Sequence, residues 1–395
     1  MLKQIEGSRA IAETVALCRP EVICAYPITP QTHIVEDLSE IVKAGELARC
    51  AFINVESEFA AMSVAIGASA AGARAYTATS SQGLLYMTEA LYNAAGLGLP
   101  IVMTLGTRAI GAPINIWNDH SDAMALRDAG WVQLFAESNQ EAADLHVIAF
   151  RLAEELSVPV MVCVDGFVLT HAFERVDVPG QADVDAFLPP FQPREVLDPD
   201  APVTIGALVG PEAFTEVKVL AHQKLLRVIE VIPSLAADFA RTFGRSAGGL
   251  VHPYRTEDAE TVVVALGCVN GTIQEVVDAM RADGHAVGSL GVGTFRPFPF
   301  AAVRGALMRA KHVIVLEKNV SVGMGGVLAT DVREALGVDA PDMHTVIAGL
   351  GGRAITRASV RRVIDQARDG TLEPCHFLDL DRRLVEREFA HEVCR

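Results

Sequence analysis

Residues 52–83 read FINVESEFAAMSVAIGASAAGARAYTATSSQG, a strand, a helix of small apolar residues and a hydroxyl-rich turn. The helix begins near Glu58, and an acidic residue is rarely fully buried unless something pairs with it. In one interpretation Asn54 caps the helix, and Glu56 and Glu58 stabilise its first turn. In the other, Glu58 handles a proton at a ligand site. The stretch alone leaves both open.

The same alternation continues on either side of this stretch. Apolar strands are predicted at residues 22–25, 52–55, 75–78, 101–105 and 158–164, with helices at 7–18, 33–44, 58–71, 84–95 and 140–156. Nearly continuous apolar runs are typical of parallel strands that are covered on both faces. The sequence therefore predicts an α/β fold with a doubly wound, mainly parallel sheet.

Polar turns leave three of these strands, at residues 26–30, 79–83 and 106–108. In an open α/β sheet, ligands bind outside the carboxyl ends of the strands. We therefore expect the three turns to line one cleft.

A chain of 395 residues is long for a single core, which predicts two domains. Residues 1–172 form the first domain. Residues 173–255, rich in Pro and Asp at their start, are predicted as an extended arm or linker and the remainder of that domain, with a helix at 212–227. Residues 256–395 form a second α/β domain, in which the glycine cluster at 323–326 is assigned a packing role.

The composition excludes several classes of protein. A net charge of −16 argues against binding to nucleic acid or to an anionic membrane. No apolar run approaches the roughly 20 residues of a membrane span, and a Glu interrupts the N-terminal segment where a signal peptide is apolar, so a cytoplasmic protein is expected. The seven cysteines are scattered singly, so no metal site is predicted in this chain.

Arg108 follows an apolar strand and precedes a polar loop. A guanidinium at that position can hold a carboxylate in a fork of two hydrogen bonds, which a lysine does not reproduce. The alternative is an ion pair with Asp119 or Asp122 in the same loop, and the sequence does not choose between the two. Asp119 and His120 are adjacent, and we interpret them as part of a network that fixes the loop.

Four motifs in order resemble the α subunit of the 2-oxoacid:ferredoxin oxidoreductases, especially the pyruvate branch. They are YPITP at 26–30, VESEFAAMSVAIGASAAGAR at 55–74, TATSSQGL at 77–84 and TRAIGAPINIWNDHSD at 107–122. ALGCVNGTIQEVVDAMRADG at 265–284 and TFRPFP at 294–299 extend the resemblance over most of the chain. It implies the pyrimidine-binding domain of a thiamine diphosphate enzyme, followed by a domain like the C-terminal domain of transketolase.

The resemblance also implies roles for individual residues. Glu58 is the glutamate that hydrogen-bonds the ring nitrogen of the cofactor's aminopyrimidine, Thr29 donates to the 2-oxoacid, and Arg108 pairs with its carboxylate. The resemblance further places Tyr26, Ser80, Ser81 and Gln82 near the cofactor, and Ile28 and Asn115 at the substrate pocket.

Thiamine enzymes usually hold the diphosphate and Mg²⁺ through a GDG motif, which this sequence lacks. The resemblance therefore implies a β subunit that binds the diphosphate. It also implies γ- and δ-type partner subunits carrying [4Fe–4S] clusters, coenzyme A as co-substrate, and ferredoxin as electron acceptor.

The implied reaction is the oxidative decarboxylation of a 2-oxoacid to acyl-CoA and CO₂, with activity only in the complex. Pyruvate is favoured, and 2-oxoisovalerate, phenylglyoxylate and oxalate are the alternatives. A different class of function also stays open, a transketolase-like scaffold subunit without catalysis.

Overall fold

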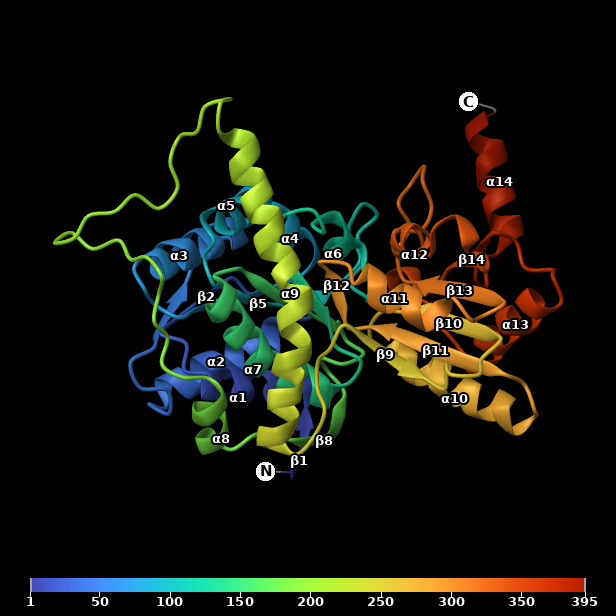
Figure 1. Ribbon diagram of the computed structural model, residues 1–395, viewed down its shortest axis with the longest axis horizontal. Helices are drawn as coiled ribbons and strands as arrows, with labels where there is room; N and C mark the ends of the chain where they lie inside the picture. Colours follow the sequence, from blue (N-terminus) through green and yellow to red (C-terminus); the bar gives the residue numbers. More distant parts are fainter. Residues whose placement is uncertain (1, 394–395) are drawn as a thin grey trace.

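The computed structural model describes residues 2–393 and has two α/β domains that lie side by side (Figure 1). The first domain is built on a seven-stranded sheet with the strand order β12-β6-β7-β5-β4-β2-β3. Its strands are β2 (Val22–Ala25), β3 (Ala51–Asn54), β4 (Ala75–Thr79), β5 (Val102–Thr107), β6 (Val132–Phe135), β7 (Val160–Asp165) and β12 (Thr294–Arg296). All neighbours pair in parallel except β12, which runs antiparallel to β6.

Helices cover both faces of this sheet, which confirms the predicted fold class. One layer contains α1 (Gly7–Leu17), α2 (Thr32–Lys43) and α7 (Asn139–Leu156), while the other contains α3 (Glu58–Ala70), α4 (Ser81–Tyr86), α5 (Thr88–Leu97) and α6 (Ser121–Ala125). Each layer buries its own apolar cluster, around Ile11 and Leu38 on one face and around Met62 and Leu91 on the other. The strands are apolar on both sides because both sides are covered.

The segment predicted as an extended arm contains regular structure. β8 (Phe173–Asp177) pairs antiparallel with β1 (Leu2–Glu6), and α8 (Gln181–Phe187) follows it. Residues 188–213 then form a long segment without a helix that leads to α9 (Phe214–Phe243), as Figure 1 shows. Part of this segment packs against the first domain, because the Leu197 N–H donates to the Ala70 carbonyl oxygen at 2.9 Å and Ile205 contacts the apolar cluster. The helix predicted at 212–227 is therefore too short, because α9 continues through Pro233.

The second domain has a six-stranded sheet with the order β15-β14-β13-β10-β11-β9. Its strands are β9 (Val251–Tyr254), β10 (Thr261–Ala265), β11 (Val287–Val292), β13 (His312–Glu317), β14 (Asp342–Ile347) and β15 (Cys375–Phe377). Its helices are α10 (Val269–Ala282), α11 (Phe300–Leu307), α12 (Leu328–Leu336), α13 (Arg357–Arg368) and α14 (Arg382–Val393), with 3₁₀ turns at Gly337–Asp339 and Leu350–Gly352.

The two domains share one apolar core. The cluster that contains Met62 and Phe135 of the first domain continues through Phe295 to Leu290 and Val313 of the second. In addition, β12 comes from the second half of the chain but extends the sheet of the first domain. The domains are thus packed together rather than merely linked.

Within residues 2–393, no helix combines the length and the apolar character that a membrane crossing requires.

Candidate active site

Arg108 is the centre of a hydrogen-bonded group at the carboxyl ends of β2, β4 and β5. Its Nη1 donates to the Thr29 carbonyl oxygen at 2.9 Å and its Nε to the Asn115 carbonyl oxygen at 3.1 Å. Its Nη2 lies 3.5 Å from Oε1 of Gln82. The structure thus brings together four of the residues that the sequence singled out, from three separate loops.

The Arg108 side chain is buried, yet it has no anionic partner among residues 2–393. Only 6% of the residue is exposed, and the oxygens that its guanidinium contacts are all neutral. Asp122 accepts the backbone N–H of Arg108 and Asp119 binds Ser121 and Gly351, so the ion-pair alternative is not what the structure has. Burial lowers the pKa of Arg108. A carboxylate ligand would supply the missing negative charge.

Glu58 is the first residue of α3, and its carboxylate is likewise free. The helix is capped by Ser57, whose Oγ accepts the N–H of Ala60 at 3.2 Å, so the interpretation of Asn54 as the cap is wrong. Glu58 is 7% exposed, and within residues 2–393 its carboxylate makes no hydrogen bond or ion pair. A nearly buried carboxylate without a partner is expected only where a ligand completes it.

Gly83 allows Glu58 to reach this position. A Cβ atom at Gly83 would lie 2.7 Å from Oε1 of Glu58 and 2.5 Å from Oγ1 of Thr79, closer than real contacts allow. The carboxylate and the hydroxyl therefore converge on the bare backbone where α4 begins. The hydroxyls of Thr79 and Ser80 are buried and have no hydrogen-bond partner in the described structure. This part of the site therefore presents unpaired polar atoms.

The remaining predicted site residues fall into two groups. Ser81 has a left-handed backbone with φ +48°, and its Oγ donates to the Ala109 carbonyl oxygen at 2.6 Å and contacts Oε1 of Gln82. Tyr26 and Ile28 share the loop of Thr29, but no hydrogen bond links either side chain to Arg108, and Tyr26 is 39% exposed.

Gln31 was missed by the sequence analysis although it is fully buried. Its Nε2 donates to the Tyr26 carbonyl oxygen at 3.0 Å and to the Ala78 carbonyl oxygen at 3.3 Å. It therefore ties the loop after β2 to β4. Nothing in the sequence distinguishes this glutamine from an exposed one near a helix start.

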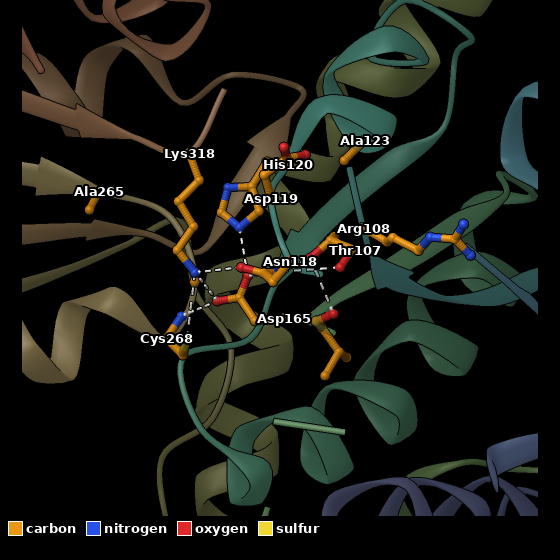
Figure 2. A network of polar contacts seen from close by, with 12 residues as sticks. Thr107, Arg108, Asn118, Asp119, His120, Ala123, Asp165, Ala265, Cys268 and Lys318 are labelled. Atoms are coloured by element: carbon orange, nitrogen blue, oxygen red, sulfur yellow. Dashed lines mark hydrogen bonds and ion pairs between the residues drawn. The ribbon is translucent and has the colours of Figure 1, made fainter. Parts of the chain in front are cut away.

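A second polar network, centred on Asp165 at the end of β7, joins the two domains (Figure 2). The Asp165 carboxylate lies 2.7 Å from Nε2 of His120 and 3.0 Å from Nζ of Lys318. It also accepts the Cys268 N–H at 2.7 Å. His120 therefore pairs with Asp165 rather than with its neighbour Asp119, which agrees with a role in fixing the loop.

The charges in this network stabilise each other. Burial alone would raise the pKa of Asp165, but Lys318 and His120 hold it well below its usual range. In Figure 2 the guanidinium of Arg108 points away from the network, so the two groups of polar residues are distinct. Asn118 links the Asp165 network to the end of β5, because its Nδ2 donates to the Thr107 carbonyl oxygen at 3.1 Å and its Oδ1 accepts from Lys318 at 2.9 Å.

The glycine cluster at 323–326 precedes a helix whose N-terminus is already occupied. The carboxylate of Glu317 accepts the N–H groups of Val327, Leu328 and Ala329 at 2.8–3.1 Å. A Cβ atom at Gly326 would lie 2.1 Å from Oε1 of Glu317, so the glycine is needed for this contact. The structure therefore supports a packing role at Gly326, whereas Cβ atoms at Gly323 and Gly325 would meet nothing within 4 Å.

A cavity lies apart from these residues. It has a volume of about 650 Å³ and opens between the domains, next to Lys318 and Cys268. None of the predicted site residues lines it. The group around Arg108 lies outside this cavity, and Asn115 ties it to the second domain because its Nδ2 donates to the Gly351 carbonyl oxygen at 3.2 Å.

Comparison with known proteins assigns the family. The model for the thiamine diphosphate-binding region of pyruvate flavodoxin/ferredoxin oxidoreductases matches residues 13–236, and the model for core domain II of pyruvate:ferredoxin oxidoreductase matches residues 259–368. The chain belongs to the pyruvate:ferredoxin oxidoreductase family. The predicted family, fold class and enzyme class are thereby confirmed.

Relatives in this family match almost the whole chain. Pyruvate synthase subunit PorA of Methanosarcina barkeri is 47% identical over 391 residues, 96% of this chain and 97% of the relative. Ketoisovalerate oxidoreductase subunit VorA of Pyrococcus horikoshii is 40% identical over 370 residues, 92% of this chain and 93% of the relative.

A solved 2-oxoglutarate:ferredoxin oxidoreductase from Magnetococcus marinus, with 2-oxoglutarate, coenzyme A and succinyl-CoA bound, has the same fold. Its TM-score is 0.72 at 20% sequence identity, and the match covers 93% of this chain but 65% of the larger one. This chain therefore spans about two thirds of the length of that protein.

The observed residues fit the aminopyrimidine part of thiamine diphosphate. Glu58 offers an unpartnered carboxylate, Thr79 and Ser80 offer unpaired hydroxyls, and Gly83 leaves room where a side chain would collide with Glu58. These groups are suited to the polar edge of a heterocycle.

Proposed function

We propose that this chain is the α subunit of a heteromeric, thiamine diphosphate-dependent 2-oxoacid:ferredoxin oxidoreductase that acts on pyruvate. The observation that carries the proposal is the buried Arg108 guanidinium, which has no carboxylate partner within residues 2–393 and is bonded to Thr29, Gln82 and Asn115. The free Glu58 carboxylate lies beside the turn that holds Gln82. Residues 1–172, with the 173–255 segment, provide the pyrimidine-binding domain, and residues 256–395 provide the transketolase C-terminal-like domain.

Each site residue has one task in this proposal. The cofactor, when bound, supplies a carbon nucleophile and an electron sink. Glu58 binds the ring nitrogen of the aminopyrimidine and holds a proton there. Thr79 and Ser80 lie within the same buried turn and help to orient the ring, with Tyr26, Ser81 and Gln82 around it.

The substrate is held from the other side of the site. Arg108 pairs with the carboxylate of the 2-oxoacid until CO₂ leaves, and the Thr29 hydroxyl donates to the substrate oxygen. Ile28 and Asn115 shape the pocket. Because the Arg108 guanidinium is fixed by two backbone carbonyls, it is oriented before the substrate arrives.

Partner subunits complete the reaction. A β subunit binds the diphosphate and Mg²⁺, for which this sequence has no GDG motif, and partners with [4Fe–4S] clusters carry the electrons. The 2-oxoacid loses CO₂, coenzyme A accepts the acyl group, and the two electrons pass singly through the clusters to ferredoxin. The exposed apolar side chains of Ile114 and Trp117, in the loop that follows Arg108, are consistent with a site shared between subunits.

A specific observation keeps 2-oxoisovalerate as the second candidate substrate. The ketoisovalerate subunit matches this chain at 40% identity, against 47% for the pyruvate synthase subunit of M. barkeri. That difference is small for two enzymes with different substrates, so identity favours pyruvate only modestly.

The test is the reduction of a low-potential dye by the purified complex with coenzyme A. The acids are pyruvate, 2-oxoisovalerate, 2-oxoglutarate, oxalate and phenylglyoxylate. We expect the highest kcat/KM with pyruvate. A preference for 2-oxoisovalerate would show that this acid, and not pyruvate, is the substrate. If the complex binds no thiamine diphosphate and reduces the dye with none of the acids, the scaffold alternative is favoured.

A further inference from the structure

Asp122 is a buried carboxylate with no side-chain cation partner among residues 2–393. It lies in the first turn of α6 and has no exposed surface. Its Oδ2 accepts two backbone N–H groups, from Ser81 at 2.9 Å and from Arg108 at 3.0 Å, and its Oδ1 accepts the N–H of Ala123 at 2.8 Å. Burial raises the pKa of Asp122 to about 8, and a buried carboxyl group that binds only backbone N–H groups fixes the position of the loops that donate them.

The two N–H groups on Oδ2 come from different loops of the site. Ser81 follows β4 and Arg108 follows β5, and α6 carries Asp122 to a point between them. Ser81 also has a left-handed backbone with φ +48°, a conformation that residues with a side chain rarely adopt. The hydrogen bond to Asp122 stabilises that conformation.

A closed ring of polar contacts results. Asp122 binds the N–H of Ser81, and the Ser81 hydroxyl contacts Oε1 of Gln82. The same Gln82 oxygen lies 3.5 Å from Nη2 of Arg108, whose own N–H returns to Asp122. Asp122 therefore holds Arg108 in two ways. It binds the backbone N–H of Arg108 directly, and through Ser81 it positions the Gln82 oxygen that faces the Arg108 guanidinium.

We propose that Asp122 is a positioning residue for the substrate arginine, setting the place of Arg108 relative to the Ser81–Gln82 turn. The inference rests on the proposed function, in which Arg108 binds the carboxylate of the 2-oxoacid. Asp122 itself touches neither substrate nor cofactor. Its loss therefore moves the KM for the 2-oxoacid more than it moves kcat at saturation.

The test is a kinetic comparison of Asp122→Ala and Asp122→Asn in the assembled complex. Asp122→Ala is expected to raise the KM for pyruvate about tenfold, and Asp122→Asn, whose carboxamide oxygen still accepts both N–H groups, by about threefold or less. A matched control is Asp144→Asn, because Asp144 is also buried but binds Arg245, away from the site. The control is expected to keep KM within about twofold.

Two outcomes overturn the inference. One is an assembled Asp122→Ala complex with the KM of the unaltered enzyme. The other outcome belongs to a double-mutant cycle of Asp122→Asn and Gln82→Ala, which replaces Asp122→Ala if that variant does not assemble. Because both residues belong to one ring, we expect the double variant to raise KM by less than the product of the two single effects. A double variant whose effect on KM equals that product would contradict the ring. An unaltered complex that reduces no dye with any 2-oxoacid would instead defeat the proposed function, and the inference with it.

Discussion

Glu58 and its exposed neighbour Glu56 form a natural pair of test positions. Glu58 is the first residue of α3 and Glu56 lies two residues before it, and of the two only Glu58 is buried. Glu58→Gln removes the acidic group while keeping the shape of the side chain. We expect kcat to fall by about 10²-fold or more, because the ring nitrogen loses its proton partner, while the complex still assembles. Steady-state dye reduction measures the loss, and Glu56→Gln is the control.

Near-normal turnover of the Glu58→Gln complex would contradict the assignment of Glu58 as the residue that binds the aminopyrimidine. An equal loss in Glu56→Gln would show that the effect arises from the helix start rather than from the site.

Arg108 tests the substrate side of the proposal. Arg108→Lys keeps the charge but loses the planar fork that bonds the Thr29 and Asn115 carbonyls. The KM for pyruvate is expected to rise about 10–100-fold, with a smaller change in kcat. Arg127→Lys is the control, because Arg127 is a half-buried arginine that also bonds a backbone carbonyl nearby. Unchanged kinetics in Arg108→Lys would mean that Arg108 has only a structural role.

Single residues differ in how well the sequence reveals them. Arg108 could be singled out because it follows an apolar strand in a loop that parallel strands bring to one edge of the sheet, whereas Thr29 was assigned through the resemblance to the family. Asp122 and Gln31 could not, because their roles consist of hydrogen bonds to backbone groups distant in the sequence. Such partners follow from tertiary packing and leave no local pattern.

His252 joins two elements and makes their contact sensitive to pH. It lies on β9, with its Nδ1 3.2 Å from Glu137 and its Nε2 3.6 Å from Glu141 at the start of α7. Burial lowers the pKa of His252, but the two glutamates outweigh it and raise the pKa to about 9. The protonated histidine thus stabilises the contact between β9 and α7.

The sign of the pH dependence follows from this shift. Because the folded pKa lies above the usual value of about 6.5, the stabilisation is complete below pH 6.5 and is lost as the pH rises through 9. Its full size is about 3 kcal/mol. We expect the Tm of the purified chain to fall over this range and His252→Gln to flatten the fall. Replacement of the exposed His222 should leave it unchanged, and an equally steep fall in His252→Gln would contradict the assignment.

The strands and helices show where apolar periodicity predicts structure and where it fails. The apolar runs gave β2, β4, β5 and β7 to within two residues. β6 was missed because it is four residues long and contains Gln133, whose side chain bonds the Ala123 carbonyl inside the fold. α9 passes through Pro233 because its apolar face, including Ile232 and Leu235, is buried in the cluster shared with α7.

At the scale of the whole molecule, the sequence predicted two α/β domains but not how they join. β12 pairs with β6 in the first sheet, and Asp165 contacts Cys268 and Lys318. Both sets of contacts link segments more than 100 residues apart in the sequence. A polar residue at the end of an apolar strand was the available signal for both Asp165 and Lys318. Their pairing across the domains depends on packing that no local pattern specifies.

The buried ion pair between Lys318 and Asp165 is expected to stabilise the contact between the second domain and the first. Lys318→Met leaves the Asp165 carboxylate buried without its ammonium partner, which should lower the free energy of unfolding by about 3–5 kcal/mol. The double variant Lys318→Met with Asp165→Asn removes both charges and should recover part of this loss. Lys311→Met breaks an exposed pair with Glu260 and should change little. Urea unfolding of the unaltered chain and the three variants measures the differences in the free energy of unfolding. A Lys318→Met chain with the same free energy of unfolding as Lys311→Met would show that the buried pair does not hold the domains together.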